Sequence, residues 1–210
     1  MPTDRHRDEG ALGRAPCLVG VALLLASCNT PAPAPESGPA TPVIEAPAPQ
    51  AAKIVVANVV WPELTDEGRA VIAALPKEAA ARVAASKLPV FLPPTEAWLA
   101  GATVVTKATW TTASMRADGL TIVVTGSRAA RVVPGVSPVK GNVPVRGALG
   151  FVTRNEGVWA VSWIENEVAY SVEIECDVGG DARCADEALA MGVARDLVFA
   201  GGDAAEGGAR

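Results

Sequence analysis

The second half of the chain alternates between apolar and polar residues with the period of a β-strand. Leu120, Ile122 and Val124 fall on one side of an extended chain, and the residues between them fall on the other. The pattern predicts strands over residues 90–92, 103–107, 109–116 and 120–125, in a sheet with one buried and one half-polar face. Asp118-Gly119 separates the last two strands and is a strong signal for a two-residue hairpin turn.

Three further strands are predicted in succession, over residues 148–154, 158–165 and 168–175, with turns at 155–157 and 166–167. Such a run is typical of an antiparallel meander. Trp159 and Trp163 share one face of the second of these strands, and Tyr170 belongs to an apolar face of the third. Large side chains at this spacing usually pack against helices or a second sheet, and less often they line a ligand cavity. The pattern leaves both alternatives open and favours the core.

Helical periodicity is confined to shorter segments. Thr65 is a suitable N-cap for a helix that ends near Pro76, and a second helix is expected to begin at Pro76 and continue to about residue 85. A last helix is expected from Asp186, with Leu189 and Val193 on its apolar side. Residues 53–61 predict a first strand, residues 134–144 a loop rich in Pro and Gly, and residues 199–201 an edge strand.

Together these elements predict an α+β fold. We expect an antiparallel, meander-rich sheet packed on two or three short helices, in a single globular domain over residues 51–202. About 150 residues are enough for one hydrophobic core but hardly for two. Residues 203–210 are rich in Gly and Ala and are expected to be a disordered tail.

The N-terminal region has a different pattern. Arginines precede an apolar run at residues 17–26, which is too short to span a bilayer because a transmembrane helix needs roughly 20 apolar residues. The run closes on Leu25-Ala26-Ser27-Cys28. This stretch resembles the lipobox of bacterial lipoprotein signal peptides. The alternative is an ordinary secretory peptide in which Cys28 is an incidental thiol.

The lipobox resemblance implies how the chain is processed and where it resides. Residues 1–27 are then a signal peptide, the thiol of Cys28 carries diacylglycerol, and Cys28 becomes the first residue of the mature protein. Two or three acyl chains hold a protein durably at a membrane. Asn29 in place of Asp after the cysteine favours the periplasmic face of the outer membrane as the location in the cell envelope.

Residues 28–50 are predicted to be a tether. The segment carries seven prolines among Ala, Thr and Ser with almost no charge. Such a composition favours polyproline II at about 3.1 Å per residue, so residues 29–50 reach at most roughly 70 Å from the bilayer. A proline-rich ligand for a partner domain is the alternative.

Charge and cysteine content narrow the class of protein further. Residues 1–27 contain three acids and three arginines, so the mature chain keeps the formal net charge of −5, which disfavours nucleic acid as a partner. After processing, Cys176 and Cys184 are the only thiols left besides Cys28, and the oxidising envelope favours a disulfide between them. A metal site built from these cysteines with Asp177 and Asp181 is the less favoured alternative.

Catalytic candidates are few. His6 is the only histidine and lies in the predicted signal peptide, so nucleophilic or zinc chemistry that needs an imidazole is not expected. Ser137 and Lys140 match Ser-x-x-Lys but fall in a proline-rich loop without the companion motifs. Glu173 and Glu175 alternate with apolar residues and are expected on the solvent face. The chain is therefore predicted not to be an enzyme and to use no cofactor or metal.

One resemblance covers the stretch from about residue 87 to residue 202. The positions of Gly147, Trp163, Glu165 and Tyr170 resemble those of an uncharacterised domain at the extracytoplasmic C-terminus of bacterial lipoproteins and anti-sigma-linked regulators. The resemblance implies structural roles for these residues and no catalytic ones. The cysteine-containing segment at residues 176–184 departs from that pattern. A more distant similarity is to envelope lipid carriers, which curl an antiparallel sheet around helices to hold acyl chains.

Two functions from different classes follow from these observations. The first is a membrane-anchored, non-catalytic interaction or sensing module whose partners are the bilayer, through its lipid anchor, and an envelope protein. The second is a lipoprotein that binds a lipid or a small apolar ligand, with Trp159, Trp163 and Tyr170 lining a cleft between sheet and helices.

Overall fold

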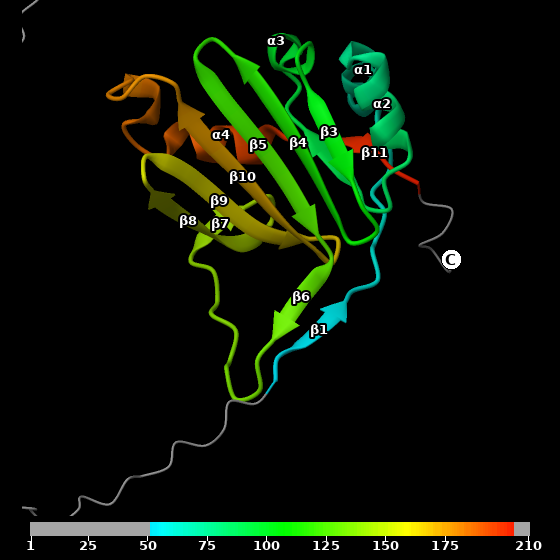
Figure 1. Cartoon of the computed structure of the whole chain (residues 1–210), viewed down its shortest axis with the longest axis vertical. Coiled ribbons are helices and arrows are strands. Elements are labelled where there is room, and N and C mark those ends of the chain that lie inside the picture. The colour runs from blue at the N-terminus through cyan, green and yellow to red at the C-terminus, as the bar shows by residue number, and fades with distance from the viewer. Residues whose placement is uncertain (1–50, 204–210) are drawn as a thin grey trace, which may run out of the picture. The chain divides into compact units, whose positions relative to one another are not determined.

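A computed structural model describes residues 51–203 of the chain, which lie within one compact unit. The proposed signal peptide, Cys28 and the proline-rich segment lie outside the described residues, as do residues 204–210. A seven-stranded antiparallel sheet forms the centre of the unit, in the order β3-β4-β5-β10-β9-β8-β7 (Figure 1). Its strands are β3 (Thr103–Thr106), β4 (Trp110–Ala117), β5 (Leu120–Ser127), β7 (Val143–Val145), β8 (Ala148–Asn155), β9 (Val158–Glu165) and β10 (Val168–Cys176).

The alternating pattern produces the predicted two-faced sheet. Along β5, every second residue from Leu120 is buried, and β10 alternates in the same way from Val168. Asp118 and Gly119 have φ of 55° and 75° between β4 and β5, which is the backbone conformation of the predicted two-residue turn. The hairpin is therefore confirmed.

The predicted meander is also confirmed. Strand β9 pairs antiparallel with both β8 and β10. Its connections to these strands contain left-handed residues, with φ of 50° at Glu156 and 56° at Asn166. Strand β10 then pairs with β5 and joins the meander to the β4–β5 hairpin, which makes one continuous sheet.

Four short helices accompany the sheet in the described part of the chain: α1 (Asp66–Ala74), α2 (Lys77–Ala84), α3 (Glu96–Leu99) and α4 (Ala188–Asp196). The Thr65 hydroxyl accepts a hydrogen bond from the Gly68 amide at 3.2 Å, so Thr65 is the N-cap of α1 as predicted. Pro76 is the N-cap of α2 and not its first helical residue. Helix α3 was not predicted, because four residues are too few for a helical period to appear.

A single core lies between the sheet and the helices. Helix α4 packs on β9 and β10, and α2 packs on β3. A two-stranded sheet of β2 (Val90–Leu92) and β11 (Val198–Gly201) packs on α1, and this pairing confirms the edge strand expected at residues 199–201. The buried apolar residues form one cluster that runs from Val59 to Ala200. The described residues carry a hydrophobic core of their own, so we expect them to fold without residues 1–50.

The predicted first strand is shorter than expected and has a different partner. Strand β1 (Lys53–Val56) ends well before Trp61 and pairs with β6 (Ala129–Val132), which was not predicted. The two strands form a ribbon outside the main sheet (Figure 1). The loop expected at residues 134–144 ends earlier, because Val143 to Val145 form edge strand β7. Pro144 is tolerated there because an edge strand leaves one row of amides unpaired.

Across residues 51–203, the helices are all too short or too polar to cross a bilayer.

Candidate functional site

The aromatic residues predicted to line a cleft lie on the face of the sheet that the helices cover. Trp163 and Tyr170 are 3 % and 2 % exposed, and Trp159 is half-buried at the edge of the core. The rings of Trp163 and Tyr170 stack with their centroids 5.7 Å apart, and Phe91 meets Tyr170 edge-on at 5.1 Å. These side chains fill the space between sheet and helices, which is the core alternative of the two that the sequence left open.

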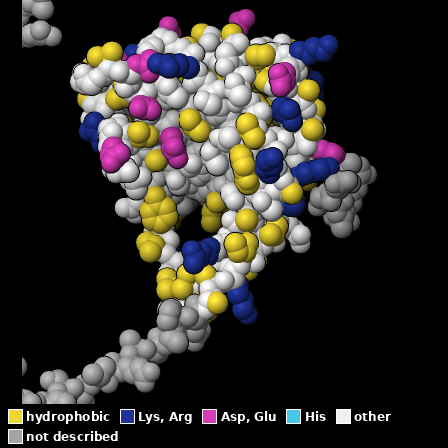
Figure 2. Space-filling model, in the orientation of Figure 1, with side chains coloured by type: hydrophobic (Ala, Val, Ile, Leu, Met, Phe, Trp, Pro, Cys, Tyr) yellow, Lys and Arg dark blue, Asp and Glu magenta, His cyan; other side chains and the backbone are white. Residues whose placement is uncertain are grey.

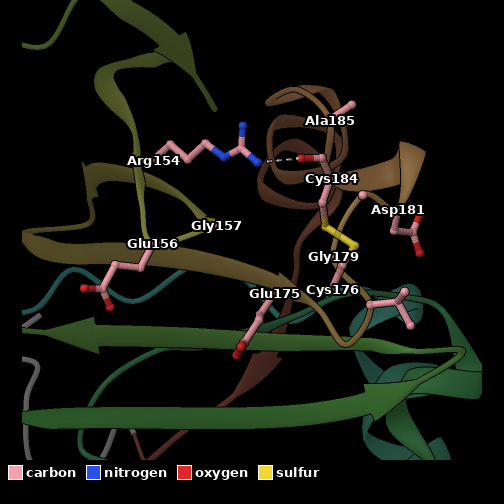
Figure 3. A pocket seen from close by; sticks show the side chains of 11 residues that line it. Arg154, Glu156, Gly157, Glu175, Cys176, Gly179, Asp181, Cys184 and Ala185 are labelled. Carbon is pink, nitrogen blue, oxygen red and sulfur yellow. Dashed lines mark hydrogen bonds between the residues drawn. A yellow bond between two sulfur atoms is a disulfide. The ribbon is translucent and has the colours of Figure 1, made fainter.

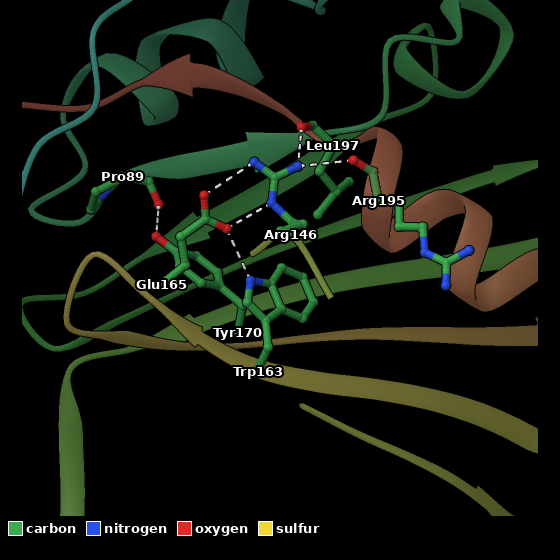
Figure 4. Close-up of polar contacts among 7 residues, drawn as sticks. All are labelled: Pro89, Arg146, Trp163, Glu165, Tyr170, Arg195 and Leu197. Carbon is green, nitrogen blue, oxygen red and sulfur yellow. Dashed lines mark hydrogen bonds and ion pairs between the residues drawn. The ribbon is translucent and has the colours of Figure 1, made fainter. Parts of the chain in front are cut away.

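A polar network joins this aromatic cluster to the last helix (Figure 4). The Arg146 guanidinium donates to both carboxylate oxygens of Glu165, at 2.6 and 3.2 Å. The indole nitrogen of Trp163 donates to the same carboxylate at 2.9 Å. Arg146 also donates to the carbonyl oxygens of Arg195, at 3.1 Å, and Leu197, at 2.5 Å. It therefore satisfies carbonyls that the end of α4 leaves without helical partners.

In this network the polar groups of Arg146, Glu165 and Tyr170 are hydrogen-bonded to one another, to Trp163 or to the backbone. Both carboxylate oxygens of Glu165 accept hydrogen bonds from the Arg146 guanidinium, and one of them also accepts from the Trp163 indole. The guanidinium lies 4.8 Å from the centroid of the Phe91 ring. The Tyr170 hydroxyl donates to the Pro89 carbonyl at 2.9 Å. Burial raises the pKa of Tyr170 above its ordinary value, with a smaller contribution from the Glu165 charge.

The resemblance implies structural roles for Glu165 and Tyr170, but nothing in the sequence identifies Arg146 as a partner of Glu165. The two ends of the ion pair are 19 residues apart on different strands, so no local spacing connects them. Arg146 is also one of the few non-glycine residues with positive φ, at 48°, next to Gly147 at 82°. This tight turn before β8 directs the guanidinium toward α4.

The predicted disulfide is confirmed at the opposite end of β10. Cys176 and Cys184 are bonded, with their Cα atoms 6.2 Å apart (Figure 3). The bond ties the last residue of β10 to the 3-10 turn η1 (Ala182–Cys184). The Cys184 carbonyl also accepts from the indole of Trp159 at 3.0 Å and from Arg154 at 3.4 Å. Across residues 51–203, no cluster of three or more potential ligands could hold a metal ion.

The pocket beside this disulfide is small, and several charged side chains line it. Its volume is about 230 Å³, and its wall includes Arg154, Glu156, Glu175 and Asp181 (Figure 3). Hydrogen bonds from the side chain and backbone of Arg183 lower the pKa of Asp181 to about 2. The shifted pKa is explained by this neighbouring cation, which also donates to the Asp118 carbonyl at 2.9 Å and so braces the loop.

The remaining catalytic candidates lie apart from one another on the surface. Ser137 and Lys140 are both exposed in the loop between β6 and β7. Glu173 and Glu175 are exposed on the face of β10 that points away from the helices, as predicted. Glu173 pairs with Val123 of β5, and Glu175 pairs with Thr121.

An apolar pocket lies on the face of the sheet that the helices leave open. It has a volume of about 460 Å³ and is walled by the β6–β7 loop and by β8, β9 and β10. Figure 2 shows hydrophobic side chains around a hollow at the lower end of the domain. We call this pocket the open-face groove; its lining residues are Val139, Lys140, Gly141, Leu149, Phe151, Ser162, Trp163, Ile164, Ala169 and Tyr170.

The apolar character of the groove comes from exposed side chains of β8 and β9. Leu149 and Ile164 are 62 % and 64 % exposed, and Phe151 is 37 % exposed. Strand pairing brings them together, because Phe151 pairs with Ser162 on β9 and Ile164 pairs with Ala169 on β10. The loop between β6 and β7 adds Val139 and Lys140 to the wall of the groove. The groove can bind an apolar group, and Lys140 can contact an anion at its rim.

Comparison with known proteins found no match to this chain, whether among family models, curated proteins or solved structures.

Proposed function

We propose that this protein is a bacterial envelope lipoprotein whose globular domain is a non-catalytic interaction module. In this proposal Cys28 carries the acyl chains, residues 28–50 are the tether, and the mature protein resides on the periplasmic face of the outer membrane. The resemblance of Leu25-Ala26-Ser27-Cys28 to a lipobox supports the anchor. The partner is an envelope protein that contacts the open face of the sheet.

The open-face groove is the observation that carries the interaction module. A groove of about 460 Å³ with exposed Leu149, Phe151 and Ile164 is costly to leave in water, and uncovered apolar patches of this kind mark binding surfaces. The polar groups of the covered face, by contrast, are occupied by one another. Lys140 is the only charged residue in the groove wall, which suits recognition better than acid–base catalysis.

A second candidate function rests on the same groove. Its volume falls within the roughly 300–1,000 Å³ that small-molecule sites occupy, and its walls are mostly apolar. A fatty acid fits this chemistry, since Phe151 and Ile164 would contact the acyl chain and Lys140 would contact the carboxylate. This version of the ligand-binding function places the ligand on the open face of the sheet and not between sheet and helices; Trp163 and Tyr170 are among the lining residues in both versions.

Metabolic labelling tests the anchor. Cells that express the full chain and its Cys28→Ser variant are labelled with radioactive palmitate, and the product is purified from the membrane fraction. We expect label and membrane association in the original chain and neither in the variant. Label that persists in Cys28→Ser, or a protein that stays in the soluble fraction in both cases, would contradict the lipoprotein assignment.

Titration with a fluorescent fatty acid separates the two functions of the groove. The ligand-binding function predicts saturable binding to residues 51–203, and an Ile164→Asp variant would lose it. The interaction module predicts no saturable binding, together with a specific protein cross-link from a photoreactive residue at position 164 in intact envelopes. Val178→Asp is the matched control, because Val178 is similarly exposed, at 68 %, and lies outside the groove.

A further inference from the structure

The ribbon of β1 and β6 is apolar and yet exposed on both of its faces. All four residues of β1 are exposed, and so are Ala130, Arg131 and Val132 of β6. Ile54 is 72 % exposed, and its neighbours Val55 and Val56 are about half exposed. A two-stranded ribbon with no covered face has marginal stability in water. Burial of the ribbon against another surface would stabilise it.

The loop that follows β6 continues the same surface. Val133, Val136 and Val139 are exposed there, with Val136 at 66 % and Val139 at 80 %. We call residues 53–56 and 129–140 together the tip. Figure 1 shows the ribbon and its loop projecting beyond the sheet at one end of the domain. Most of the strongly exposed large apolar side chains of residues 51–203 therefore lie in the tip or in the adjoining groove.

The charge of the tip is of one sign. Residues 51–62 and 119–155 contain no Asp or Glu, although the chain as a whole has a net charge of −5. The tip itself carries Lys53, Arg131 and Lys140, all exposed. On the face drawn in Figure 2, the lower end shows hydrophobic and basic side chains and no acidic one. Acidic residues lie elsewhere, for example in the loop after β10.

A surface that combines exposed valines with lysine and arginine matches the interface of an anionic bilayer. The apolar side chains enter the boundary between headgroups and acyl chains, and the cations contact phosphate groups. The described chain begins at residue 51, directly before β1, so any segment that leads to an anchor at Cys28 leaves the domain from the tip. An anchored domain would therefore present this end to the membrane.

We propose that the tip is a membrane-docking surface that inserts its valines into an anionic lipid interface. The anchor of the proposed function would bring the tip to the bilayer, but the contact itself needs only residues 53–56 and 129–140. Docking would hold the domain close to the membrane in place of letting it move over the full reach of the tether. It would also set the open-face groove beside the lipid surface, since Val139 and Lys140 belong to both.

Vesicle binding by residues 51–203 tests this proposal without the anchor. The fragment is sedimented with vesicles of an equal mixture of phosphatidylcholine and phosphatidylglycerol, and in parallel with pure phosphatidylcholine. We expect binding to the anionic vesicles, weaker binding at high salt, and about fivefold weaker binding for each of Arg131→Ala and Lys140→Ala. Val136→Asp should weaken binding more than about tenfold, because it removes an inserted side chain and adds a repelled charge.

Val178→Asp is the matched control for Val136→Asp. The two valines are almost equally exposed, at 68 % and 66 %, and the substitution adds the same charge at a site outside the tip. Because both positions are on the surface, circular dichroism should show that both variants keep the fold. The proposal predicts that Val178→Asp binds anionic vesicles nearly as well as the original fragment.

Two results would overturn the proposal. The fragment could fail to bind anionic vesicles, or Val136→Asp and Val178→Asp could weaken binding equally. If vesicle binding is absent and a photoreactive residue at position 136 cross-links to a protein in intact envelopes, the tip is a protein interface instead. The palmitate-labelling result does not depend on these outcomes, so failure of the tip and failure of the lipid anchor are distinguishable.

Discussion

The two faces of the seven-stranded sheet differ in how far their side chains are buried and hydrogen-bonded. On the covered face, apolar side chains such as Ile122 and Val172 are fully buried, and the polar atoms of Arg146, Glu165 and Tyr170 bind one another or backbone carbonyls. On the open face, Ile164 remains exposed beside a groove of about 460 Å³. The contrast indicates that one face maintains the fold while the other is available for contact.

Matched isoleucine substitutions test this contrast most strongly. Ile122 is fully buried on β5, whereas Ile164 is 64 % exposed on β9. We expect Ile122→Ala to lower the free energy of unfolding by about 2–5 kcal/mol, because it leaves a cavity in the core. Ile164→Ala should change it by less than about 0.5 kcal/mol. Urea unfolding followed by tryptophan fluorescence measures both, and equal losses would contradict the division between the faces.

The ion pair of the covered face should have the next largest effect. Arg146→Met leaves the largely buried Glu165 carboxylate and the carbonyls at the end of α4 without their donor, so we expect a loss of about 3 kcal/mol. The control is Arg116→Met, which removes an exposed pair with Asp177 and should cost less than about 1 kcal/mol. The free energy of unfolding measured in urea distinguishes them. Similar losses in the two variants would show that the Arg146 network does not brace the last helix.

Reduction of the disulfide should have a somewhat smaller effect. The bond closes a loop with a sequence separation of 8 residues, for which the chain-entropy model gives a stabilisation of about 2.5 kcal/mol. Cys176→Ser combined with Cys184→Ser should lower the midpoint of urea unfolding accordingly. Because the bond lies at the end of the sheet away from the groove, vesicle binding by the double variant should be unchanged. A simultaneous loss of vesicle binding would contradict this separation.

The smallest effect expected is a loss of stability at alkaline pH. Tyr170 is the only tyrosine, and burial raises its pKa above the ordinary value of 10.0. A raised pKa means that Tyr170 holds its proton more tightly in the folded state than in the unfolded state. Its contribution to the free energy of unfolding is therefore complete below pH 10 and declines above it, as the unfolded state ionises. Phenolate absorbance should therefore rise near pH 10 in urea but not in the native protein. Titration near pH 10 without unfolding would show that Tyr170 is not buried.

Local pattern was enough to predict most of the sheet. The period of two, the Asp118-Gly119 turn and the separate apolar runs at 148–175 depend on residues close together in sequence, and these elements are confirmed. Strand β6 was missed because Ala129 to Val132 has no alternation, and both of its faces are exposed. A strand with no buried face has no period to detect.

The candidate site was harder to predict than the fold. The aromatic residues were correctly placed on shared faces, but the face that remains open could be known only once the helices were placed. Leu149 and Ile164 belong to different strands, and the loop residue Val139 joins them only through the fold. The cysteine pairing, in contrast, followed from a count of the thiols that remain outside the predicted signal peptide, and it is confirmed.

Position-specific photo-cross-linking in intact envelopes tests the central claim most directly. A photoreactive residue is placed at Ile164 on the open face, or at Val178 beyond the end of β10, in the otherwise unchanged full chain. The account predicts a discrete adduct from position 164 and none above background from position 178. Adducts of equal yield from both positions, or none from position 164 in a membrane-associated protein, would contradict the assignment of the open face as the contact surface.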